Sequence, residues 1–110
     1  MCGRFGLFAP PEIVAEEFKL PDLPSFEASY NIAPTEEGPT IGERPDSGER
    51  SFSALRWGLI PFWSDGPEDF SSDLINARAE TVEEKPAFKK QFRERRCVVP
   101  ASGFYEWKPS

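Results

Sequence analysis

An α+β domain built mainly of short strands, with two short helices, is the fold class that the sequence predicts. Twelve prolines and eight glycines divide the 110 residues into short elements, which disfavours long helices and internal repeats. The length corresponds to one domain, and a hydrophobic content of 38% is sufficient for a core. Short strands with brief helices between them therefore fit the composition best.

The first predicted helix covers residues 12–18, directly after Pro10 and Pro11. Proline is favoured at the start of a helix, and acidic residues in its first turns are favourable as well. Pro21 ends the helix. The apolar face that we expect to pack on the core consists of Ile13, Val14 and Phe18.

A β-hairpin is predicted from residues 39–44 and 50–60. The two runs are rich in residues that favour strands, and the polar segment 45–49 between them has the composition of a turn. Trp57 falls within the second run, so we expect it in the core.

Residues 61–73 are rich in Gly, Pro, Ser and Asp, which predicts a surface loop. We expect this loop to display the aromatic residues Phe62, Trp63 and Phe70.

A second helix is predicted over residues 85–95, because Pro86 lies near its start and Phe88 and Phe92 fall on one face. Two short strands, 97–100 and 103–107, are predicted to follow. Cys97 belongs to an apolar run, and we expect it in the core.

Composition excludes several kinds of chemistry. The chain contains no histidine, which excludes a Ser-His-Asp triad, a Cys-His pair and any histidine-bearing metal site within it. Its two cysteines are too few for a four-cysteine zinc site or a disulfide scaffold, and this indicates a reducing, cytoplasmic setting. No transmembrane span or signal peptide is visible, so we expect no membrane partner.

The formal net charge of −6 argues against nonspecific binding along duplex DNA. Arginine, however, outnumbers lysine by eight to five, and its guanidinium group is suited to bidentate phosphate contacts. A local basic cleft therefore remains compatible with the acidic composition.

Cys2 directly follows the initiator methionine, and removal of Met1 would expose a 1,2-aminothiol. Amine and thiol are both partly deprotonated near neutral pH. The amine can condense with an aldehyde to an imine, and the thiol can then close a five-membered thiazolidine. The same pair can instead attack an amide. Position alone also permits a small, half-buried residue near a frayed terminus.

Five ordered segments resemble the SOS-response-associated peptidase (SRAP) family, whose members capture abasic sites in single-stranded DNA. They are residues 1–5 (MCGRF), 30–35 (YNIAPT), 56–63 (RWGLIPFW), 75–81 (INARAET) and 96–107 (RCVVPASGFYEW).

The resemblance implies a curved, mainly antiparallel, barrel-like sheet with short flanking helices. It also implies that residues 1–110 form the N-terminal part of an SRAP domain. The C-terminal half of the family, which carries a further active-site histidine, is expected to be absent here. No metal or organic cofactor is implied.

In the family pattern, Cys2 is the nucleophile and Asn76 and Glu106 complete its site. The aromatic neighbours of Glu106 would bury it and suit it to proton transfer, whereas spacing alone also fits a solvated strand carboxylate. Asn76 can orient both the amine and a substrate oxygen, or be an ordinary turn asparagine.

The resemblance assigns DNA phosphates to Arg4 and Arg78, although either can instead form a surface salt bridge. Phe62, Trp63 and Trp107 are predicted platforms for unstacked bases. A further candidate, Pro34, is expected to shape a loop near the site.

The predicted function is covalent capture of abasic sites in single-stranded DNA by a monomeric, cytoplasmic, nucleoid-associated protein in the DNA damage response. Thiol (auto)peptidase and lyase activities are also expected of such a protein. Two alternatives stay open: an N-terminal-nucleophile (auto)peptidase, and a noncatalytic module that binds single-stranded DNA or modified bases.

Overall fold

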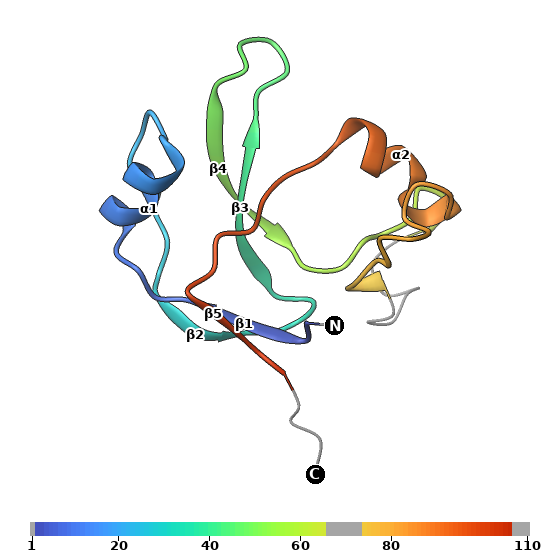
Figure 1. Cartoon of the computed structure of the whole chain (residues 1–110), viewed down its shortest axis with the longest axis horizontal. Helices are drawn as coiled ribbons and strands as arrows, with labels where there is room; N and C mark the ends of the chain where they lie inside the picture. Colours follow the sequence, from blue (N-terminus) through green and yellow to red (C-terminus); the bar gives the residue numbers. More distant parts are fainter. Residues whose placement is uncertain (1, 66–73, 107–110) are drawn as a thin grey trace.

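The computed structural model describes residues 2–65 and 74–106 of the chain (Figure 1). Its antiparallel strands form two sheets, one of three strands in the order β2-β1-β5 and one of two strands, β3-β4. This confirms the α+β class. The described strands do not close into a barrel, so the barrel-like form stays a prediction. The elements are β1 (Arg4–Leu7), α1 (Pro11–Phe18), β2 (Ser29–Ile32), β3 (Glu37–Glu43), β4 (Arg50–Arg56), α2 (Pro86–Glu94) and β5 (Gly103–Tyr105).

Strand β1 is the centre of the three-stranded sheet. On one side Phe5 pairs with Ile32, and on the other Arg4 pairs with Tyr105. The register against β2 shifts between Phe5 and Leu7. At this shift a Cβ atom on Gly6 would lie 3.0 Å from two backbone carbonyl oxygens, so the close approach of the strands favours glycine here. The sequence did not predict β1 or β2.

Helix α1 confirms the first predicted helix but begins one residue earlier, at Pro11, and ends where Lys19 adopts a left-handed conformation with φ 55°. The Lys19 N–H donates to backbone carbonyls of the last turn. Val14 is buried, and Phe18 packs partly buried against the core. Ile13 is 50% exposed, which corrects the prediction that it docks there.

The β3-β4 hairpin confirms the predicted pairing, with register running from Glu37↔Arg56 to Glu43↔Arg50. Gly48 forms its turn at φ 70°, and its N–H donates to the Arg44 carbonyl over 2.8 Å. The predicted second strand is too long, because β4 ends at Arg56.

Trp57 follows β4 and packs against the core half-buried, with its ring edge-on to Phe5 at a centroid separation of 5.4 Å. Its side chain is therefore part of the core surroundings, as expected, although the residue lies outside the strand.

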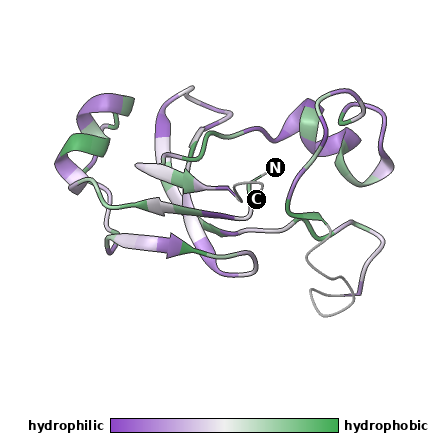
Figure 2. Ribbon diagram, turned by 60° about the horizontal axis from the view of Figure 1, so that its bottom comes forward, coloured by the Kyte–Doolittle hydropathy of each residue, from purple (hydrophilic) through white to green (hydrophobic). Residues whose placement is uncertain are grey.

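The buried core is small and lies mainly between the two sheets and α1. Helix α1 and helix α2 occupy opposite ends of the molecule, with the strands between them (Figures 1 and 2). Among the helices described, none is long and apolar enough to cross a membrane. Among the residues that the structure describes, the hydrophobic core consists of Phe5, Leu7, Val14, Ile32 and Ile41.

Helix α2 confirms the second predicted helix, and Phe88 and Phe92 are both half-buried on it. The predicted strand 97–100 is wrong: only an isolated bridge joins Val98 to Ile41, through two backbone bonds of 2.9 Å. Cys97 is exposed, which overturns its placement in the core. A single bridge leaves the flanking residues without the cover of a sheet.

Candidate active site

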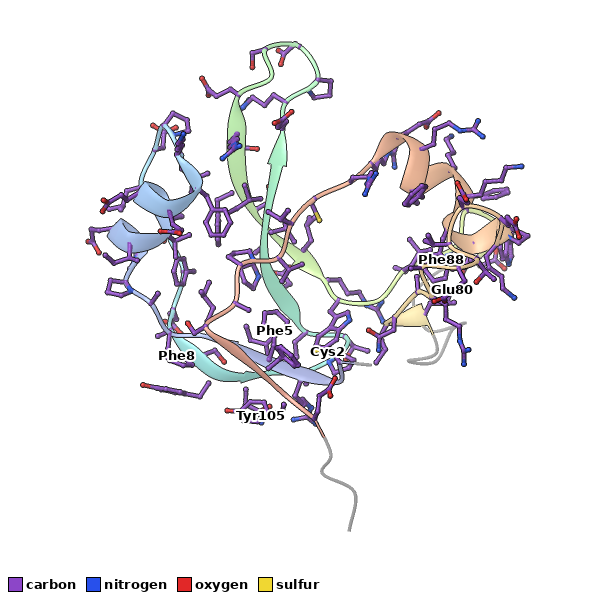
Figure 3. The ribbon with its side chains drawn as sticks, viewed as in Figure 1. Cys2, Phe5, Phe8, Glu80, Phe88 and Tyr105 are labelled. Carbon is purple, nitrogen blue, oxygen red and sulfur yellow. The ribbon has the colours of Figure 1, made fainter. Side chains whose placement is uncertain are left out.

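Cys2 lies two residues before the start of β1, is half-buried, and lines a cavity of about 600 Å³. Figure 3 shows it beside Phe5 at the end of the three-stranded sheet. The thiol lies 3.4 Å from the carbonyl oxygen of Arg4. Apolar side chains make up most of the cavity wall, and Asn76 also contributes to it.

Asn76 reaches the chain at Cys2 from a distant part of the sequence. Its Nδ2 donates a hydrogen bond of 2.8 Å to the Cys2 carbonyl oxygen. The segment before Asn76 is fixed on the residues that follow β4: Trp57 Nε1 donates to the Ile75 carbonyl at 2.8 Å, and the Leu59 N–H donates to that of Leu74 at 3.1 Å. The structure thus brings together two of the three predicted catalytic residues.

Glu106 directly follows β5. Because β5 runs antiparallel to β1 with Tyr105 opposite Arg4, the chain at Glu106 continues alongside Gly3. Glu106 is exposed, which fits the alternative of a solvated strand carboxylate and not burial among its aromatic neighbours. The strand pairing places Glu106 near Cys2. Glu106 does not line the cavity of Cys2.

Each of the two predicted phosphate-binding arginines follows a candidate catalytic residue by two positions, Arg4 after Cys2 and Arg78 after Asn76. Arg4 is exposed, and its Nη1 donates to Asn31 Oδ1 over 3.1 Å. Arg78 is exposed two residues after Asn76. Neither forms an ion pair with another residue that the structure describes, so the alternative of surface salt bridging gains no support there.

The predicted aromatic platform is displayed on the surface. Phe62 is 82% exposed and Trp63 51% exposed, and their rings meet edge to face at a centroid separation of 5.1 Å. Trp63 lines a second cavity next to that of Cys2. Phe70 and Trp107 fall outside the described residues.

Pro34 is half-buried in the turn after β2. This turn is tied to Trp57 by two backbone bonds: Thr35 N–H donates to the Trp57 carbonyl at 2.9 Å, and the Trp57 N–H donates to the Glu36 carbonyl at 3.0 Å. The expectation that Pro34 shapes a loop near the site fits this position. It does not line the cavity itself.

Sequence reasoning missed Arg56, the one charged residue among those that line the Cys2 cavity in the described structure. Its Nη1 donates to the Gly58 carbonyl at 3.0 Å. Gly58 has φ 128°, and a Cβ atom there would lie 2.9 Å from Arg56 Nη1. The sequence RWG at residues 56–58 could have indicated this contact, because a side chain at position 58 would displace the guanidinium group of Arg56. Cys97 also lines this cavity.

No group of three or more His, Cys, Asp or Glu residues within ranges 2–65 and 74–106 is placed to hold a metal ion. The arrangement instead offers a half-buried thiol, an amide that fixes its backbone, and one guanidinium group, all on one largely apolar cavity.

Comparisons with known proteins give consistent results. The family model described as SOS response associated peptidase (SRAP) matches residues 1–110. The abasic site processing protein YoqW of Bacillus subtilis is 44% identical over 98% of this chain and 48% of its own length. The abasic site processing protein HMCES of mouse is 33% identical over 98% of this chain and 36% of its own length.

A crystal structure of a Bordetella bronchiseptica protein matches with a TM-score of 0.74 and 29% identity, over 96% of this chain and 50% of that one. The chain therefore spans about half the length of the Bacillus relative and of this solved structure.

Proposed function

The chain belongs to the SOS response associated peptidase (SRAP) family, and from this premise we propose that it captures abasic sites in single-stranded DNA in the response to DNA damage. The names of the Bacillus and mouse relatives, abasic site processing proteins, support this substrate. We assign residues 1–110 to the N-terminal part of an SRAP domain.

The observation that carries the proposal is the 2.8 Å bond from Asn76 to the carbonyl of Cys2. It fixes the backbone of the nucleophile through an atom that takes no part in the reaction. After removal of Met1, the α-amine and the thiol of Cys2 both remain available at the cavity. An aldehyde that enters this cavity meets both nucleophiles at once.

The reaction forms a thiazolidine from the ring-opened abasic sugar. The Cys2 amine adds to C1 of the aldehyde, and loss of one water gives an imine. The thiol sulfur then adds to the imine carbon, and its proton passes to the nitrogen, which becomes a secondary amine. Two bonds to C1 form, one to nitrogen and one to sulfur, and no oxidant is needed.

The other site residues assist in this proposal without bonding to the sugar. Glu106 transfers protons to and from the sugar oxygen and the amine, and Asn76 orients the nucleophile. Arg4 and Arg78 bind phosphates. Bases stack on Phe62, Trp63 and Trp107, while Pro34 shapes the adjacent loop.

Covalent capture explains how so few contacts hold a lesion. Each stacked base contributes roughly 1–3 kcal/mol, whereas a micromolar complex requires about 8 kcal/mol after the costs of association. Two or three stacks and two phosphate contacts therefore give weak, salt-sensitive binding.

The proposal is tested with the mature chain and a single-stranded oligonucleotide that contains one abasic site. We expect an adduct that survives denaturing electrophoresis and is absent for Cys2→Ala. Cys97→Ala is the matched control and retains the adduct, because Cys97 has no neighbouring free amine. An adduct that persists in Cys2→Ala contradicts the assignment.

We also infer that the family's thiol peptidase activity acts on Met1 and that the protein releases adducts as a lyase. Measurement of the intact mass tests the first activity: retention of Met1 in Glu106→Gln supports self-processing, whereas its removal from this variant contradicts it.

We further propose that the protein is monomeric, cytoplasmic and associated with the nucleoid.

A further inference from the structure

The cavity of Cys2 has the size and the character of a site for a small apolar molecule. Its volume of about 600 Å³ lies within the range of about 300–1,000 Å³ that is usual for small-molecule pockets. Aliphatic and aromatic side chains from β1, β3, β4, β5 and the segments between them make up most of its wall. Among the residues that the structure describes, no carboxylate lines it.

The longer polar side chains of the wall are already bonded to the main chain. Each of three side-chain donors gives a hydrogen bond to a backbone carbonyl oxygen. The three bonds are Thr40 Oγ1 to Ser53 at 2.9 Å, Arg56 Nη1 to Gly58 at 3.0 Å and Asn76 Nδ2 to Cys2 at 2.8 Å. Hydroxyl and phosphate groups lose hydrogen bonds to water when they enter such surroundings, whereas an alkyl chain has none to lose. The wall therefore suits an alkyl chain better than it suits the polar groups of an abasic sugar.

The apolar wall begins beside the nucleophile and is open to water. Figure 3 shows Cys2 next to Phe5, a residue of the buried core that also lines the cavity. Leu55 and Phe104 line it as well, although they are 52% and 65% exposed. A ligand that covers these side chains removes apolar surface from water, which is favourable in proportion to the area covered.

We propose that the mature chain also captures free aliphatic aldehydes, with the carbonyl carbon at Cys2 and the alkyl chain along the apolar wall. The inference rests on the proposed function for the exposed aminothiol, and it adds a class of substrate that contains no nucleic acid. The aminothiol reacts with any aldehyde, so the wall decides which free aldehydes react fastest. A long alkyl chain is held beside Cys2 before the reaction, and a short one is not.

The reaction balances without an oxidant or reductant. The Cys2 amine adds to the aldehyde carbon, and loss of one water gives an imine. The thiol sulfur adds to the imine carbon, and its proton passes to the nitrogen, which closes the thiazolidine ring. The product has the mass of the protein plus the aldehyde minus one water. A chain in this form has no free amine, so it can no longer crosslink DNA.

The test compares hexanal with propanal on the mature chain, whose lack of Met1 is verified by intact mass. The rate constant of adduct formation is measured by mass spectrometry at aldehyde concentrations well below saturation. A fully buried methylene corresponds to a gain of about fourfold and a half-covered one to about twofold. The three additional methylenes of hexanal therefore predict a ratio of rate constants between about 8 and about 60.

A synthetic peptide of residues 2–5 is the reference, because it has the same aminothiol but no cavity. Its ratio should be near one, since the added methylenes lie far from the carbonyl group. A protein ratio equal to that of the peptide overturns the inference. This comparison needs no variant of the protein, so it stands whatever the stability of the variants.

Leu55→Thr tests the wall itself. It should lower the rate constant for hexanal about twofold or more and leave that for propanal unchanged, because it removes apolar surface from the wall without touching Cys2. Leu23→Thr is the matched control: Leu23 is 61% exposed and does not line the cavity, so both rate constants should equal those of the parent protein. Equal ratios for the two variants contradict a role of the wall.

The outcome is separable from that of the proposed function. A peptide-like ratio together with a normal abasic-site adduct rejects aldehyde selection alone. A high ratio without any abasic-site adduct retains the aldehyde site and rejects capture of DNA. A ratio that falls as the protein concentration rises also overturns the inference, because it assigns the apolar wall to contact between copies of the chain.

Discussion

At Asn76 one side-chain amide joins segments that are 74 residues apart in the sequence. The amide donates to a carbonyl, so it constrains the position of Cys2 without consuming the lone pair of the amine or the thiol. Alanine at position 76 would release the backbone of the nucleophile while leaving its chemistry intact.

Asn76→Ala should therefore slow adduct formation with an abasic oligonucleotide. The loss of one hydrogen bond of about 0.5–1.5 kcal/mol corresponds to a decrease of between about twofold and about tenfold. The measurement is the rate of adduct formation at saturating DNA.

Asn31→Ala is the control for this prediction, because it removes the partner of Arg4 and leaves the anchor of Cys2 in place. We expect it to raise the DNA concentration needed for half the maximal rate and to leave the maximal rate unchanged. An Asn76→Ala rate equal to that of the parent protein would show that the bond does not position the nucleophile.

Among the elements, β1 has the largest influence on the site because Cys2 lies two residues before its start and because it pairs with strands on both edges. Its register shift against β2 brings the carbonyl oxygens of Ser29 and Tyr30 close to Gly6. The Tyr105 hydroxyl also donates to the Tyr30 carbonyl at 2.8 Å, linking the two outer strands across β1.

Gly6→Ala should destabilise the protein by about 1–3 kcal/mol, because backbone atoms at 3.0 Å must move to admit the methyl group. Chemical denaturation measures this change. Gly103→Ala is the matched control on β5, since no atom lies within 4 Å of a Cβ there. Equal stability of both variants would indicate that the β1-β2 register adjusts freely.

Sequence patterns predicted the elements whose signals are local. Pro10 and Pro11 indicate the start of α1, and the polar turn 45–49 indicates the hairpin. Both could be predicted because each pattern determines the conformation of residues close to it in the sequence. Strands β1 and β2 have only four residues each and depend on partners far along the chain, so no local pattern reveals them.

Motifs predicted the residues of the candidate site, and the structure places two of them, Cys2 and Asn76, in contact. The environment of the site was not predictable, because the exposure of Glu106 and the position of Cys97 on the cavity depend on the course of the chain after α2. An apolar run usually indicates burial, but the single bridge at Val98 leaves Cys97 exposed. Arg56 lines the cavity with its guanidinium group bonded to the Gly58 carbonyl, and this placement depends on the fold of the chain around Gly58.

At the scale of the whole molecule, little apolar surface is buried. Within residues 2–65 and 74–106, five hydrophobic side chains form the buried core, while large apolar side chains such as Leu55, Val99 and Phe104 are more than half exposed and line the Cys2 cavity. The radius of gyration is 15.0 Å, against about 13 Å for a compact domain of this length.

We predict that the 110-residue chain binds the dye ANS in its native state and unfolds with a free energy at or below the usual minimum of about 5 kcal/mol. Fluorescence titration and urea denaturation test the two statements. Addition of a polypeptide that corresponds to the second half of the Bacillus relative should lower the dye signal. Absence of dye binding would mean that the chain covers these residues by itself.

The anchor on the Cys2 carbonyl has one further consequence. Asn76 bonds to the carbonyl group of Cys2 and not to its nitrogen. A molecule that retains Met1 can therefore bind DNA in the same pose, while the Cys2 nitrogen, held in a peptide bond, does not react. Such unprocessed copies would occupy lesions as reversible competitors of the mature form. The yield of crosslinked DNA would then depend on the proportion of chains from which Met1 has been removed as well as on the concentration of the protein.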